Sequence, residues 1–186
     1  DGADIYITST DKVFNKGSMN QTGIFVLDEI SFGTSPLSIM AGLRYDHATF
    51  YRGNFSIETP TGETAFLHDF TGDIEDTSWG ALSPRLSMQL HKTGHYRIYA
   101  GYSRGFRAPA LDDMCRTGRI SGGMQRGNPY LEPEYLDNVE AGGDLFIGER
   151  FKLSASAFYS QGSDYHAYIA TGDSVVLNNR LRPIRI

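Results

Sequence analysis

Alternation of apolar and polar residues is the clearest pattern in the chain. It is clearest in segment 37–46, where Leu37, Ile39, Ala41, Leu43 and Tyr45 alternate with a mostly polar set, Ser38, Met40, Gly42, Arg44 and Asp46. A period of two is the spacing of side chains on one face of a β-strand. The same reasoning predicts strands over 22–32, 79–91, 95–105, 135–147 and 151–160, a short strand at 3–8, and a last strand beginning near Val175.

The connections between these strands alternate in length. Short turns are expected at 33–36, 92–94 and 148–150, and long polar loops at 9–21, 47–78, 106–134 and 161–174. If neighbouring strands pair antiparallel, every long loop lies at the same end of the sheet. Bacterial outer-membrane barrels have this asymmetry, with short periplasmic turns and long extracellular loops. A soluble β-sandwich also alternates, but its strands are shorter and its loops rarely exceed about ten residues at one end only. The pattern therefore favours an all-β fold, an antiparallel transmembrane β-barrel segment.

Three local features refine this prediction. Pro84 lies on the apolar face of its strand and predicts a bulge or an unpaired stretch, because proline lacks a backbone donor. Residues 109–114 can form one helical turn. The aromatic residues near strand ends suit the girdles that barrels place at the two membrane interfaces: Tyr45, Phe50, Tyr51, Trp79, Tyr102, Phe106, Phe151 and Tyr159.

Composition narrows the function. The formal net charge of −5 argues against a nucleic-acid-binding protein. The sequence contains no run of about 18 apolar residues, so no transmembrane helix is predicted. The N-terminal DGADIYITS lacks the features of a signal peptide. The single cysteine, Cys115, forms no internal disulfide. No metal-spaced Cys/His cluster, P-loop or G-x-S-x-G motif is present. An enzyme, a resident cofactor and a metal site are therefore not expected.

The segment 102–142 carries a family resemblance. Its FRAP at 106–109, NPYLEPE at 128–134 and EAG at 140–142 resemble the FRAP…NPxLxPE…E-x-G pattern of TonB-dependent outer-membrane receptors. GLRYD at 42–46 and SPRL at 83–86 also resemble strands of that family. The motif positions, for which we expect structural roles, are Phe106, Arg107, Pro109, Asn128, Pro129, Leu131, Pro133, Glu134, Glu140 and Gly142.

The resemblance implies a barrel of about 22 strands with a plug inside it. It also implies energised nutrient import across the bacterial outer membrane, with TonB as partner through the plug. Seven or eight predicted strands make about a third of such a barrel, and residues 1–186 contain no plug. We therefore expect a fragment, the C-terminal part of the barrel, whose outer surface contacts lipid and lipopolysaccharide.

Candidate ligand contacts lie in the long central loop. Arginine forks suit anionic chelates, so Arg116, Arg119 and Arg126 are candidates for binding a ferric siderophore. The alternative is that they pair with nearby carboxylates or with lipopolysaccharide phosphates. Trp79 and Tyr99 are candidates for stacking on a ligand in the lumen, with packing as the alternative.

Histidine placement bears on haem as cargo. Some haem receptors that this chain resembles have a histidine between FRAP and NPNL, and residues 110–127 contain none. The histidines are His47, His68, His91, His95 and His166. Met114, Cys115 and Met124 are possible ligands of haem iron, although such residues are more often packed. The sequence thus favours a ferric siderophore over haem, cobalamin or an oligosaccharide. A structural or adhesive β-protein is the remaining alternative.

Overall fold

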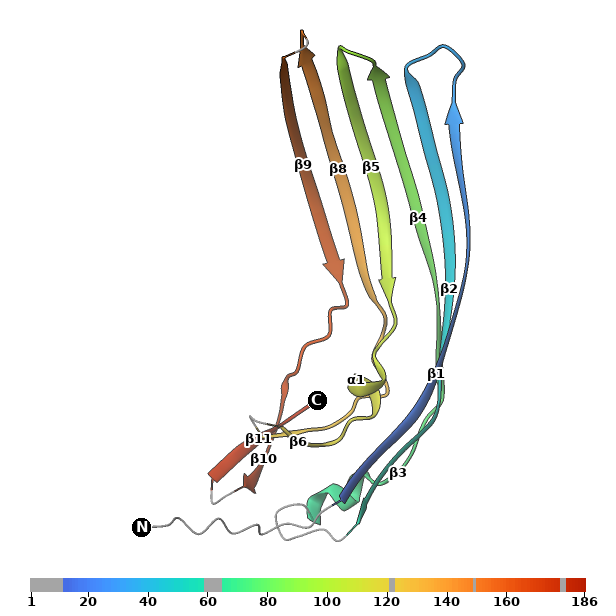
Figure 1. The fold of residues 1–186 in the computed structure, drawn as a ribbon. Helices are drawn as coiled ribbons and strands as arrows, with labels where there is room; N and C mark the ends of the chain where they lie inside the picture. The colour runs from blue at the N-terminus through green and yellow to red at the C-terminus, as the bar shows by residue number, and fades with distance from the viewer. Residues whose placement is uncertain (1–11, 59–64, 121–122, 149, 178–179) are drawn as a thin grey trace.

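The computed structural model describes residues 12–58, 65–120, 123–148, 150–177 and 180–186. Most of it is one antiparallel sheet in the order β1-β2-β4-β5-β8-β9, with β3 paired to β2 (Figure 1). A small second sheet has the order β10-β11-β7-β6. The elements are β1 (Lys12–Ser31), β2 (Leu37–Glu58), the 3-10 helix η1 (Ala65–Phe70), β3 (Gly72–Ile74), β4 (Thr77–Lys92), β5 (Tyr96–Arg107), α1 (Leu111–Cys115), β6 (Gly118–Ile120), β7 (Gly123–Gln125), β8 (Glu134–Ile147), β9 (Phe151–Ser163), β10 (Ala170–Leu177) and β11 (Arg180–Arg185).

The register keeps one face of the large sheet apolar and the other polar. Ile39 lies opposite Met88 in the β2–β4 ladder, and Met88 lies opposite Ala100 in the β4–β5 ladder. On the other face, Gln89 lies between Ser38 and Tyr99. The apolar side chains are uncovered, with about half of their surface exposed: Leu43, Leu86, Met88, Ile98, Val139 and Leu145. An apolar face of this extent is unusual in a soluble monomer and is expected where strands face lipid.

The expected asymmetry of connections is confirmed. The β1–β2 turn closes with the Ser35 amide donating to the Phe32 carbonyl, and Gly33 and Gly94 have the positive φ values that favour glycine at tight turns. Gly148 has φ 62 at the third turn. These turns lie together at the top of Figure 1, while α1 and the small sheet lie at the opposite end.

Three of the predicted loops are wrong in large part. Within 9–21, β1 already begins at Lys12, and residues 9–11 lie outside the described residues, as does the predicted strand at 3–8. Within 47–78, β2 continues to Glu58, and η1, β3 and the start of β4 follow. The β1–β2 ladder runs on to Lys12↔Glu58, with one register shift between Lys16 and Ser18. Pairing between neighbours extends these strands despite their polar composition, because strand propensity depends strongly on context.

The region at 161–174 differs in the same way, because β9 extends to Ser163 and β10 begins at Ala170. The strand predicted to begin near Val175 corresponds to β10, which starts five residues earlier, and a further strand, β11, follows it. The 106–134 region is also not a plain loop, since it contains β6 and β7. The predicted helical turn is confirmed as α1.

Pro84 marks the place where β4 and β5 separate. The β4–β5 ladder begins at Arg85↔Ser103 and runs only to Lys92↔Tyr96. On its other side, β4 stays paired with β2 through Pro84 to Thr77. The predicted unpaired stretch is thus confirmed on the β5 side. Past this point β5 continues beside β8 alone, and the chain after it turns back toward β1 and β2 as α1 (Figure 1).

The buried core lies at the loop end of the sheet. One cluster contains Phe55, Ile57, Leu67, Met124 and Ile184, and a second contains Ala48, Phe50, Trp79, Met114 and Cys115. Each cluster joins long-strand residues to residues of the region between β5 and β8. The loop region is therefore a packed structure anchored on the strands. Among the described residues, no helix is long and apolar enough to cross a membrane.

We expect Met88→Arg to destabilise the parent protein, meaning the longer receptor expected to contain this segment, by about 2–4 kcal/mol. The reason is that the variant places a cation on the face assigned to lipid. Gln89→Arg is the matched control, since its side chain starts on the polar face. The measurement is the free energy of unfolding from lipid vesicles. Equal costs for the two variants would contradict the assignment of the faces.

Candidate functional site

The region between β5 and β8 is closed at its base by an ion pair. Arg107 and Glu134 are the last pair of the β5–β8 ladder, and Arg107 Nε lies 2.9 Å from Glu134 Oε2. The Glu134 side chain is 8% exposed. Arg107 belongs to the FRAP motif and Glu134 to the NPYLEPE motif. The two motifs therefore meet where the wall ends and the loop begins.

Glu134 also holds the segment that follows β9. Its Oε1 accepts the His166 backbone N–H at 2.8 Å. The His166 ring lies 2.7 Å through Nε2 from the Glu132 carbonyl oxygen. A carbonyl can only accept, so Nε2 carries the proton in this contact. Nδ1 lies 3.7 Å from Glu134 Oε1 and is a buried atom without a hydrogen-bond partner in the described part of the chain.

Tyr168 ties the same segment to two other elements. Its hydroxyl donates to Asp113 Oδ1 of α1 at 3.0 Å and accepts from Gln125 Nε2 of β7 at 3.1 Å. Burial, and then the hydrogen bond to Asp113, raise the pKa of the Tyr168 phenol. Both effects favour the neutral phenol, which is the form that donates this bond.

The remaining motif residues shape the loop. The Asn128 amide donates to the Asp113 carbonyl, and Asn128 Oδ1 accepts the Tyr130 amide at 3.0 Å. Gly127 passes close to the end of α1, where a Cβ atom would lie 2.6 Å from the Met114 carbonyl oxygen. Pro109 is fully buried and Pro133 is buried, whereas Pro129 is half-buried. Leu131 packs against the second core cluster. These contacts hold the loop between β5 and β8 against α1 and the second core cluster.

The motif residues Glu140 and Gly142 lie on the polar face of β8, whereas the motif residue Phe106 lies on the apolar face of β5. Tyr99 lies across Gly142, because a Cβ there would be 2.5 Å from the Tyr99 hydroxyl. Tyr99 also lies under the Arg97 guanidinium, 5.1 Å from its ring centroid. Glu140 pairs with Gly101 on the same face. Phe106 lies 6.0 Å from Tyr135, ring centroid to ring centroid, on the opposite face.

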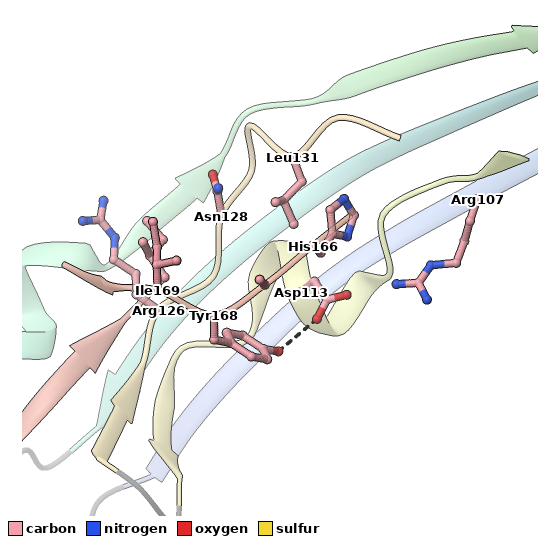
Figure 2. A pocket seen from close by; sticks show the side chains of 10 residues that line it. Arg107, Asp113, Arg126, Asn128, Leu131, His166, Tyr168 and Ile169 are labelled. Carbon is pink, nitrogen blue, oxygen red and sulfur yellow. Dashed lines mark hydrogen bonds between the residues drawn. The ribbon is translucent and has the colours of Figure 1, made fainter. Parts of the chain in front are cut away.

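A pocket of about 320 Å³ lies where these segments meet (Figure 2). Its lining comes from β5, α1, the stretch before β8, the segment after β9 and the end of the chain. The lining residues are Arg107, Asp113, Arg126, Asn128, Leu131, His166, Ala167, Tyr168, Ile169 and Ile186. In Figure 2 the Tyr168 ring and Asp113 face each other, with Arg107 beyond Asp113 and Arg126 on the far side of Tyr168.

The structure separates the three candidate arginines. Arg126 lines the pocket, with its guanidinium 4.3 Å from the Phe70 ring centroid. Arg116 instead pairs with Asp112 at 2.9 Å, one helical turn away. Arg119 is exposed on β6 and is not part of the lining of this pocket. Of the three arginines, Arg126 is therefore the one that lines this pocket.

The other candidates have different surroundings. Trp79 is 8% exposed and packs in the second cluster beneath α1. Met114, Cys115 and Met124 are buried in the two clusters, and burial raises the pKa of the Cys115 thiol. The Cys115 thiol donates to the Leu111 carbonyl at 2.8 Å, and Met114 and Met124 are among the most deeply buried side chains described. No group of three or more His, Cys, Asp or Glu residues within the described ranges is arranged to hold a metal ion.

Sequence reasoning missed His166 and Tyr168 as pocket residues. Both lie in a segment assigned to a long polar loop, and their partners Glu134 and Asp113 are 32 and 55 residues away along the chain. One signal was available, because Glu134 belongs to a recognised motif and a motif carboxylate next to a strand start needs a partner when buried.

We expect Glu134→Ala to loosen the segment after β9, because it removes the acceptor for the His166 amide and the partner of Arg107. The loss is about 1–3 kcal/mol of local stability. Limited proteolysis of the parent protein should then cleave within 164–169 sooner. Glu132→Ala is the control, since only its backbone carbonyl takes part. Equal cleavage rates in the two variants would contradict the role of the Glu134 carboxylate.

Comparison with known proteins gives a consistent result. The family model described as "TonB dependent receptor-like, beta-barrel" matches residues 2–183. The hemin receptor of Yersinia enterocolitica is 28% identical over 160 residues, which is 78% of this chain and 20% of that protein. Heme/hemopexin utilization protein C of Haemophilus influenzae (strain ATCC 51907 / DSM 11121 / KW20 / Rd) is 23% identical, again over 78% of this chain and 20% of that protein.

A solved structure supports the fold. It is a double mutant of the Serratia marcescens hemophore receptor HasR in complex with its hemophore HasA and heme, with a TM-score of 0.57 and 19% identity. The match covers 78% of this chain and 25% of that one. The chain thus spans about a fifth of the length of the curated relatives it matches. Because the family model covers nearly the whole chain, the chain belongs to the TonB-dependent receptor β-barrel family.

Proposed function

We propose that this chain is part of the barrel of an outer-membrane receptor that takes up haem. The observation that carries the proposal is that the curated relatives described above are named for hemin or heme, and they align over 78% of this chain. This replaces the ferric siderophore as the favoured cargo and adopts the alternative that the sequence had left open. Haem here is the transported substrate, not a resident cofactor.

One feature of the pocket bears on the main argument against haem. That argument was the lack of a histidine in residues 110–127. His166 and Tyr168 reach the same loop region from the segment after β9, and both line the pocket. The His166 ring contacts the Glu132 carbonyl and the Tyr168 hydroxyl donates to Asp113, so we assign both side chains to the wall of the pocket and not to the haem iron. The lack of a histidine in residues 110–127 therefore does not decide against haem, because the segment after β9 also contributes to the lining at this end of the sheet.

The rest of the transporter is proposed to lie in the parent protein. Residues 1–186 supply part of the barrel wall, with the apolar face toward outer-membrane lipid and lipopolysaccharide. A plug inside the barrel would contact TonB and couple import to energy. The polar face carries ion pairs suited to an aqueous lumen, such as Arg97 with Asp144 at 3.1 Å and Lys152 with Asp144 at 3.3 Å. We propose a transport receptor, and not an enzyme or an adhesive β-protein.

The test is a titration of the full-length parent receptor in detergent with haemin, followed by the Soret absorbance band. We expect a saturable shift of the band, because an axial ligand or a new environment changes the haem spectrum. Ferric siderophores and cobalamin, added in excess, should not compete. Binding of a ferric siderophore with no response to haemin would overturn the proposal and leave the family assignment in place.

A further inference from the structure

We propose that the pocket around Arg126 binds the carboxylate-bearing edge of an amphiphilic macrocycle such as haem. This inference rests on the proposed function and adds which part of the ligand enters and which side chain anchors it. The pocket volume of about 320 Å³ is near the lower end of the range for small-molecule sites, which is about 300–1,000 Å³. That size suits one edge of a large ring and not the whole ring.

The charges of the lining leave one cation available for a ligand. Arg107 pairs with Glu134 at 2.9 Å, and the Asp113 carboxylate accepts the Tyr168 hydroxyl. Arg126 has no carboxylate within ion-pair distance among the described residues, although Asp69, Asp73 and Glu75 border the hollow on its other side. A guanidinium favours carboxylates because its planar fork can donate two parallel hydrogen bonds.

The walls beside Arg126 are apolar and aromatic. Leu131, Ile169 and Ile186 line the pocket together with the Tyr168 ring, as Figure 2 shows for the labelled residues. A hydrophilic chelate would gain little from such walls. A flat apolar ring that carries carboxylates at one edge matches both parts of the lining, since the ring covers the apolar wall while a carboxylate reaches Arg126.

The pocket is held in shape by bonds between its own walls. The Arg126 amide donates to the Arg185 carbonyl at 2.9 Å, and Ile169 and Ile186 exchange two backbone hydrogen bonds at 3.0 and 3.1 Å. Tyr168 links α1 to β7 through Asp113 and Gln125. Preorganisation of this kind lowers the ordering cost of binding, so the site is suited to a ligand in its present form.

The test compares haemin with haemin dimethyl ester, in which both carboxylates are blocked, on the full-length parent receptor. We expect Arg126→Gln to weaken haemin binding about 10- to 100-fold, the range for a hydrogen bond to a charged group. Its affinity for the ester should not change. Arg119→Gln is the matched control and should bind both ligands as wild type does, because Arg119 is exposed and does not line this pocket.

The outcomes separate this inference from the proposed function. Haemin binding that is unchanged in Arg126→Gln would overturn the inference alone. An equal loss for haemin and its ester would also overturn it, because that pattern marks a structural role through the Phe70 contact. Absence of haemin binding by the wild-type receptor would overturn both. Recovery of the preference for haemin over its ester in Arg126→Lys, which keeps the charge, would support the anchor.

Discussion

The ion pair between Arg107 and Glu134 is the constraint on which the loop end of this structure depends. It closes the last pair of the β5–β8 ladder, so it fixes where the wall ends and where the intervening segment leaves it. The second oxygen of Glu134 accepts the His166 amide and thereby sets the path of the chain after β9. A buried carboxylate is costly unless it is paired and hydrogen-bonded, and here both partners serve to join two loop regions.

The strand framework could be predicted from sequence because one physical signal determines it. Strands that separate lipid from an aqueous lumen must alternate, and the alternation at Leu37 to Asp46 appears in the structure as two distinct faces. Pro84 was informative for a related reason, because a residue without a backbone donor fits a place where a strand is unpaired on one side, here the side facing β5. The motifs gave the family, and the structure adds the reason that Arg107 and Glu134 occur together.

The loop end could not be predicted because its contacts are distant in sequence. The alternation is short at the loop end, where Phe55 and Ile57 of β2 lie opposite the mostly polar run 12–18, so the ladder from Lys12↔Glu58 to Ser18↔Tyr51 was not predicted. The three arginines looked equivalent along the chain, yet one pairs within α1, one is exposed on β6 and one borders a pocket. The siderophore was favoured because of the arginines in the central loop, and haem was disfavoured because that loop contains no histidine, whereas His166 reaches the same region from the next loop.

A structure of the full-length parent receptor with bound haemin tests the central claim most directly, which is that haem binds where the segments after β5 and β9 meet. The account predicts haem with one carboxylate within about 3 Å of the Arg126 guanidinium, the distance of a charge-assisted hydrogen bond, and its ring against Leu131 and Ile169. Haem bound elsewhere in the receptor, with this pocket unchanged and empty, would contradict it.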